Sequence, residues 1–86
     1  MLGIYENTPS IGYCICYGES KVILESSIVK YLDIDYDKYI DILIKYGAYN
    51  LGRESKSYWF KTREDCKRCI NSEELLPYML ILILLR

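Results

Sequence analysis

Apolar and polar residues alternate along the first part of the chain in a way that predicts a β-hairpin. Residues 11–17 carry tyrosine or isoleucine at every second position, with glycine or cysteine between them, which is the period of a strand. Residues 18–20 are a Gly-Glu-Ser turn signal, and residues 21–24 can return as a second strand. We expect the glycine and cysteine side to lie under a helix, because small residues allow close approach. Residues 1–10 show no period, and we expect an irregular lead-in.

Two helices follow, because apolar residues then recur at helical spacing. The first covers about residues 26–32 and begins at a serine cap. The second runs from residue 36 to about residue 46. Asp35 precedes it as an N-cap, and Gly47 follows it as a residue suited to a left-handed stop. These boundaries rest on capping chemistry as well as on periodicity.

A second β-hairpin is predicted around a polar tip. Residues 48–51 and 57–61 have strand character, and residues 52–56 between them are rich in turn formers. The later strand holds Trp59 and Phe60, the only tryptophan and the only phenylalanine of the chain. Because large aromatic side chains dominate the energetics of cores, we expect the core to form around this strand.

Capping chemistry also predicts the third helix. Thr62 and Asp65 stand at the spacing of a capping box, so the helix begins at Arg63. Pro77 then disfavours a helical residue before it. Residues 78–85 are apolar on both faces and are interpreted as a central strand, although a buried helix has the same pattern.

The predicted fold is α+β, with the order β-β-α-α-β-β-α-β and a mixed sheet on which the helices pack. Eighty-six residues suit one core, so residues 11–86 are predicted to form a single domain. Two short helices followed by a hairpin also resemble the order of a winged helix-turn-helix, which stays open as an alternative.

Composition excludes some functions. The chain has no histidine, no phosphate-binding glycine loop and no nucleophile elbow, so we expect neither an enzyme nor a cofactor. The net charge of −1 gives no general attraction to nucleic acid or membranes. The most apolar segment is too short to span a bilayer, no secretory signal is visible, and we expect a cytoplasmic protein. Ten tyrosines fit either an AT-rich genome or a contact surface.

Four cysteines occur as two pairs, Cys14-x-Cys16 and Cys66-x-x-Cys69. Four thiolates can hold zinc, but a zinc knuckle is normally a tight turn, whereas the second pair lies inside a capped helix. We therefore expect small core residues and no metal.

Charged residues suggest two candidate surfaces. Residues 33–41 contain four aspartates and one lysine beside tyrosines, and such a surface can occupy a basic groove meant for phosphates. The protein-binding residues expected there are Tyr31, Asp33, Asp35, Tyr36, Asp37 and Asp41. The hairpin tip and third helix offer an alternative nucleic-acid patch, although acidic neighbours dilute it. Its residues are Arg53, Lys56, Tyr58, Arg63 and Lys67.

Residues 58–66 (Tyr-Trp-Phe-Lys-Thr-Arg-Glu-Asp-Cys), with Pro77-Tyr78 downstream, resemble the aromatic-Phe-Lys-Thr-x-Glu-Asp-Ala segment of small uncharacterised phage and prophage proteins from AT-rich bacteria. The likeness extends at most over residues 30–82. This chain departs from the pattern with Cys66 in place of alanine and with a longer helix before Pro77.

Proteins of that kind include anti-CRISPR proteins. The resemblance implies a phage-type inhibitor that binds a basic host defence protein or nuclease in the bacterial cytoplasm. A small DNA-binding regulator and a homodimeric adaptor module remain the alternatives.

Overall fold

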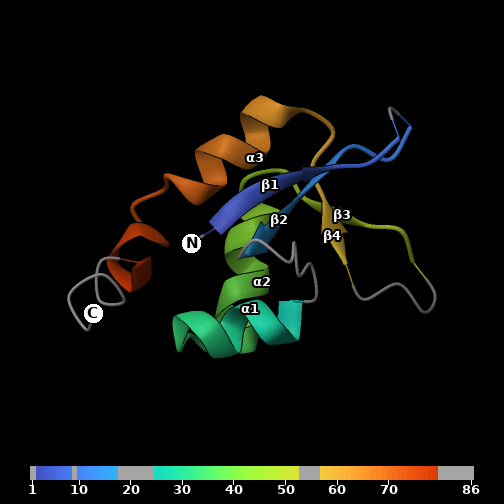
Figure 1. The fold of residues 1–86 in the computed structure, drawn as a ribbon. Coiled ribbons are helices and arrows are strands. Elements are labelled where there is room, and N and C mark those ends of the chain that lie inside the picture. The colour runs from blue at the N-terminus through green and yellow to red at the C-terminus, as the bar shows by residue number, and fades with distance from the viewer. Residues whose placement is uncertain (1, 9, 18–24, 53–56, 80–86) are drawn as a thin grey trace.

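The computed structural model describes residues 2–8, 10–17, 25–52 and 57–79, which form two β-hairpins and a set of helices packed together (Figure 1). The elements in chain order are β1 (Leu2–Glu6), β2 (Tyr13–Tyr17), α1 (Glu25–Leu32), α2 (Tyr36–Lys45), β3 (Tyr49–Asn50), β4 (Tyr58–Trp59) and α3 (Arg63–Ile70). The α+β class is confirmed, and the predicted order of elements holds from β1 to α3. The strand pairs among the described residues are antiparallel.

The first hairpin is formed by β1 and β2, which pair from Leu2 opposite Tyr17 to Glu6 opposite Tyr13. The prediction of an irregular lead-in over residues 1–10 is therefore wrong for residues 2–6. Leu2 to Glu6 shows no clear alternation in burial, and a run of five residues at a terminus is a weak signal until a partner strand is known. The second strand predicted over residues 21–24 lies outside the described residues.

Among the described residues, one backbone pair joins the two hairpins, and it consists of Tyr13 and Phe60. Tyr13 N–H donates to the Phe60 carbonyl at 2.7 Å, and Phe60 N–H donates to the Tyr13 carbonyl at 2.6 Å. This places β4 beside β2, so the spatial order of strands is β1, β2, β4, β3. The aromatic segment predicted to organise the core thus lies at the centre of the sheet.

The predicted caps set the helix boundaries. Asp35 Oδ1 accepts from the backbone N–H groups of Asp37 and Lys38, and α2 begins at the next residue after the cap. Gly47 has a φ of 98°, the left-handed conformation that ends this helix. Thr62 Oγ1 accepts from Asp65 N–H at 3.1 Å, and α3 begins at Arg63 as predicted.

After α3 the chain forms another helical turn, residues 76–79. Ser72 starts it, because its hydroxyl accepts from Leu75 N–H and its carbonyl accepts from Leu76 N–H. Pro77 is tolerated there because a residue in the first turn needs no N–H donor. The segment predicted as the last strand therefore begins with two helical residues, Tyr78 and Met79, and its other residues lie outside the described part.

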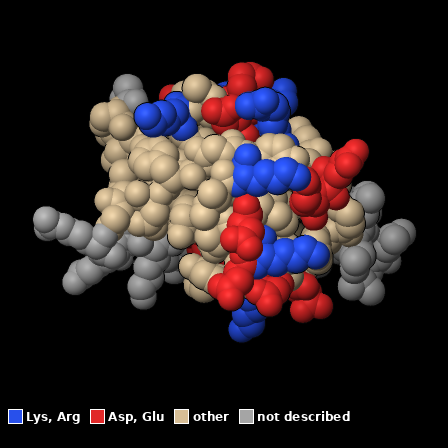
Figure 2. All heavy atoms as spheres, turned by 180° about the vertical axis from the view of Figure 1, so that it is seen from behind, with Lys and Arg blue, Asp and Glu red and all other residues tan. Residues whose placement is uncertain are grey.

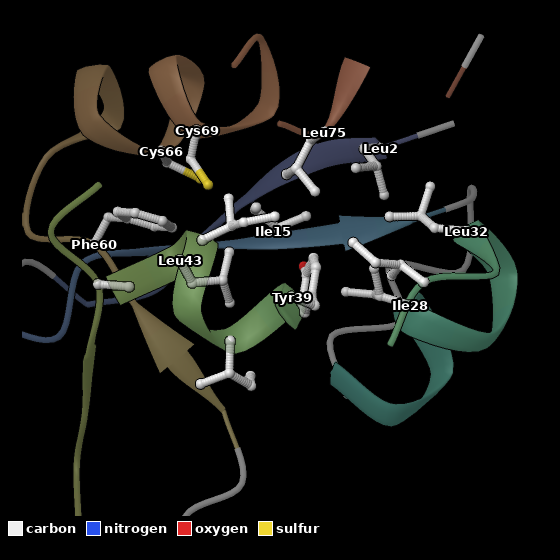
Figure 3. Packing of buried hydrophobic residues seen from close by; sticks show 14 residues of the cluster. Leu2, Ile15, Ile28, Leu32, Tyr39, Leu43, Phe60, Cys66, Cys69 and Leu75 are labelled. Atoms are coloured by element: carbon white, nitrogen blue, oxygen red, sulfur yellow. The ribbon is translucent and has the colours of Figure 1, made fainter. Parts of the chain in front are cut away.

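The core lies between the sheet and the three helices (Figure 3). Leu2 and Ile15 project from one face of the first hairpin into this cluster, together with Phe60. The helices therefore pack on the isoleucine and tyrosine side of β2, and not on the glycine and cysteine side as expected. The fully buried side chains are Cys14, Ile28, Tyr39, Leu43, Phe60, Cys66, Cys69 and Leu75. No described helix is long and apolar enough to cross a membrane.

Tyr39 on α2 and Tyr46 at the C-cap of this helix differ in the hydrogen bonding of their hydroxyl groups. The Tyr39 hydroxyl is buried and forms no hydrogen bond, whereas the Tyr46 hydroxyl donates to Glu74 Oε2 at 2.8 Å. We expect Tyr39→Phe to raise the free energy of unfolding by about 1 kcal/mol, because a buried unsatisfied polar group is removed. Tyr46→Phe should lower it, and urea unfolding of both variants checks the opposite signs. A loss of stability in Tyr39→Phe would contradict the expectation.

Candidate protein-binding surface

The junction between α1 and α2 directs its aspartates into solvent. Ile34 is buried with 7% of its surface exposed, and its N–H donates to the Val29 carbonyl at 3.1 Å. Asp33 and Asp35, on either side of it, are exposed. Asp33 has a φ of 58°, a conformation that aspartate tolerates better than most residues. One apolar anchor thus turns two carboxyl groups outward.

The other predicted residues lie on or next to helices. Tyr36, Asp37 and Asp41 are exposed on α2, and Tyr31 on α1 is half-buried against the core. Five of the six predicted protein-binding residues are therefore exposed on one continuous segment. Asp35 has a second role, because its carboxylate caps α2.

An apolar row lies next to these carboxylates on α2. Tyr36, Ile40 and Ile44 follow one another at four-residue spacing, and they are 43%, 8% and 52% exposed. Asp37 and Asp41 lie three residues before Ile40 and Ile44, so they are their neighbours on the helix surface and border the row on one side. The helical spacing of the apolar residues does not by itself distinguish Ile44 from its buried neighbours on α2. The signal that could have found it is the width of the apolar set on α2, which exceeds a single buried stripe.

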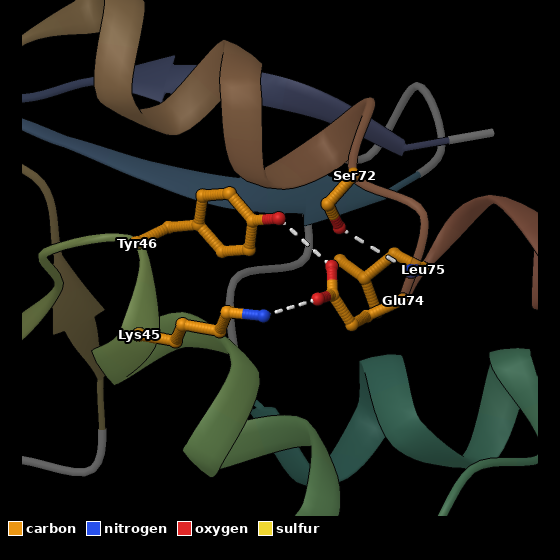
Figure 4. A network of polar contacts seen from close by, with 5 residues as sticks. All are labelled: Lys45, Tyr46, Ser72, Glu74 and Leu75. Carbon is orange, nitrogen blue, oxygen red and sulfur yellow. Dashed lines mark hydrogen bonds and ion pairs between the residues drawn. The ribbon is translucent and has the colours of Figure 1, made fainter.

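The lysines of α2 lie toward the C-terminal segment. Lys45 Nζ lies 2.5 Å from Glu74 Oε1, and Lys38 Nζ lies 5.5 Å from the centre of the Tyr78 ring (Figure 4 shows the Lys45 contact). Lys45, with Tyr46, lowers the pKa of Glu74 to about 2. Both lysines are thus engaged away from the row of Tyr36 and Ile44, and they do not neutralise Asp37 and Asp41 by direct pairing.

The charge of the molecule is mixed at larger scale. On the face opposite to the view of Figure 1, acidic side chains alternate with lysine and arginine, next to a broad region without charged groups (Figure 2). That face is therefore not uniformly acidic. A partner has to be complementary over the local area of the aspartates between residues 33 and 41 and not over a whole face.

Three residues of the alternative nucleic-acid patch lie in the described part of the chain. Arg63 and Lys67 are exposed on α3. Tyr58 is half-buried and packs against the core cluster, so its ring is only partly available for base stacking. Arg53 and Lys56 lie outside the described residues.

The side chains of the two cysteine pairs lie on different sides of the sheet at β2. Cys66 and Cys69 belong to the core cluster with Ile15, whereas Cys14 alternates with Ile15 on β2 and therefore points to the other side of the sheet. Within the described residues, no three histidine, cysteine, aspartate or glutamate side chains are placed to hold a metal ion. Burial raises the pKa of the Cys14, Cys66 and Cys69 thiols to about 12, which makes them poor nucleophiles at neutral pH.

Comparisons with family models, curated proteins and solved structures each gave no match.

Proposed function

We propose that this protein acts by stoichiometric binding to another protein and not by catalytic turnover. Its binding surface consists of Tyr31, Asp33, Asp35, Tyr36, Asp37 and Asp41. The observation that carries the proposal is the outward position of the four aspartates, of which two flank the buried anchor Ile34 and two lie on α2. Carboxylates held in this way can occupy a groove whose basic side chains otherwise contact phosphates.

The geometry of α2 supports a partner that offers more than positive charge. Tyr36 and Ile44 provide exposed apolar area, and Asp37 and Asp41 border it. Interfaces commonly combine an apolar or aromatic centre with a polar rim. The partner that fits is a basic protein, such as a host nuclease, whose nucleic-acid groove has apolar surface beside its lysines or arginines. In this proposal the protein is a phage-type, anti-CRISPR-like inhibitor in the bacterial cytoplasm.

The experiment starts from a partner captured from host lysate and identified. We expect Asp37→Lys/Asp41→Lys to weaken its binding to the purified partner by about tenfold or more, because like charges then face each other. The matched control is Glu64→Lys/Glu73→Lys, which makes the same change in net charge. Glu64 holds the same second position in α3 that Asp37 holds in α2. Asp35 is left unchanged because it caps α2.

Two outcomes would contradict the proposal. Equal loss of affinity in both double variants would mean that net charge, and not this surface, governs binding. Salt-sensitive binding of the wild-type protein to duplex DNA at micromolar or lower concentration would favour the DNA-binding regulator instead. Circular dichroism of each variant establishes that it is folded before its affinity is compared.

A further inference from the structure

Glu25 is a buried carboxylic acid that the proposed binding surface does not use. It is the first residue of α1, and only 2% of its surface is exposed. Its Oε1 accepts a hydrogen bond from the backbone N–H of Tyr58 at 3.0 Å. The side chain therefore connects the start of α1 to β4, two elements that are far apart in the sequence.

The position of this hydrogen bond is unusual for a sheet. Tyr13 and Phe60 exchange two backbone hydrogen bonds, so continued antiparallel pairing would place Tyr58 opposite Ile15 as the next hydrogen-bonded pair. The Tyr58 N–H donates to the Glu25 carboxylate instead. The Glu25 side chain thus takes the place of a strand carbonyl where β2 and β4 separate.

The surroundings of Glu25 disfavour a negative charge. Its second oxygen, Oε2, forms no hydrogen bond, and the described ion pairs, Lys45–Glu74 and Arg68–Asp65, do not include it. The groups whose pKa values its charge raises are the phenols of Tyr36 and Tyr39 on α2 and the thiol of Cys14 on β2. Burial is the main cause that raises the pKa of Glu25 to about 7, and the Tyr58 N–H opposes it.

We propose that Glu25 forms a proton-dependent contact between α1 and the β3–β4 hairpin. When the carboxyl group is neutral, it stays between β2 and β4 and holds the Tyr58 N–H. When it is ionised, the carboxylate moves into water, and the N-terminal turn of α1 separates from β4. The inference does not rest on the proposed binding function, since Glu25 is not one of the proposed binding residues.

Trp59 provides the measurement, because it is the only tryptophan, is 5% exposed and follows Tyr58 directly. We expect its fluorescence to shift to longer wavelength as pH rises between about 5 and 8, with a midpoint at or below about 7 and full reversibility. The chain has no histidine, so few other groups titrate in this range. Glu25→Gln should hold the acidic-form spectrum at every pH, whereas the exposed control Glu73→Gln should titrate like the wild type.

Amide exchange of Tyr58 gives a second measurement on the wild-type protein, which is needed if Glu25→Gln does not fold. Protection of this amide should fall by about tenfold or more across the same transition, beyond the ordinary effect of pH on exchange chemistry. A wild-type protein whose Trp59 emission and Tyr58 protection show no transition in this range would overturn the proposal. Persistence of the transition in folded Glu25→Gln would overturn it as well.

Discussion

Replacement of Gly12 by alanine should cost at least about 3 kcal/mol of stability, because it disrupts the backbone pairing of Tyr13 with Phe60 that joins the two hairpins. Gly12 has a φ of 110°, a backbone conformation that residues with a side chain rarely adopt. A Cβ atom there would lie 2.1 Å from the Phe60 carbonyl oxygen, which is backbone and cannot rotate away. That oxygen accepts the hydrogen bond from Tyr13 N–H, so relief of the clash requires β2 and β4 to separate.

The matched control for this prediction is Gly47→Ala. Gly47 also has a positive φ, 98°, but no atom lies within 4 Å of the position that its Cβ would take. Alanine there should lower the free energy of unfolding by only about 1 kcal/mol, because only the backbone conformation is unfavourable. Urea unfolding of both variants measures the difference. Similar losses in the two variants would mean that conformation, and not the contact with Phe60, limits the substitution at Gly12.

Features encoded in short stretches of sequence could be predicted. The Asp35 and Thr62 caps fixed where α2 and α3 begin, because a capping side chain bonds to N–H groups only two or three residues away. The β3–β4 hairpin was predictable for the same reason, since its strands are separated by a short polar tip. In these cases local chemistry and the final fold agree.

Features that depend on a distant partner could not be predicted in this way. β1 is recognisable as a strand only once β2 lies beside it, and the side of β2 that the helices cover depends on where Phe60 meets Tyr13. Glu25 looks like an ordinary first-turn acid, yet the fold buries it against Tyr58. The pattern of apolar residues within α1 does not indicate that β4 packs against Glu25.

The candidate surface lies between these cases. The outward position of Asp37 and Asp41 follows from the helix pattern, so the sequence could indicate it. The exposure of Ile44 depends on which part of the apolar set on α2 meets the core, and the lysines of α2 are drawn away by Glu74 and Tyr78. The sequence therefore predicted the charged part of the surface better than its apolar part.

Stability should fall as pH rises from about 4.5 to above 7, which is opposite to the trend that salt-bridged carboxylates give. The pKa of Glu25 is raised from an ordinary value of 4.5 to about 7 in the folded protein. The folded state therefore binds more protons than the unfolded state between these values. Its contribution is fully present below the unfolded pKa and is lost as pH rises through the folded pKa. A difference of this size corresponds to about 3 kcal/mol.

Urea unfolding at several pH values measures this effect, and Glu25→Gln isolates it. Glutamine keeps an oxygen acceptor for the Tyr58 N–H and carries no charge, so the variant should be more stable than the wild type above pH 7 and nearly independent of pH. Glu73→Gln, at an exposed site, should follow the wild-type curve. A wild-type stability that rises over this range would show that Glu25 is ionised in the fold without penalty.

The amount by which the free energy of unfolding falls with pH also indicates whether α1 separates from β4. If the carboxylate could not leave its buried position, the whole penalty of about 3 kcal/mol would appear in global unfolding. If α1 separates from β4 at a smaller cost, the ionised side chain reaches water within the folded state, and the loss stops at the free energy of that local opening. Each pH unit between the unfolded pKa and the midpoint in the folded protein corresponds to about 1.4 kcal/mol, so a smaller loss has to come with a Trp59 transition whose midpoint lies below pH 7. A loss well below about 3 kcal/mol with such a lowered midpoint would therefore identify local opening as the route by which the fold accommodates the charge.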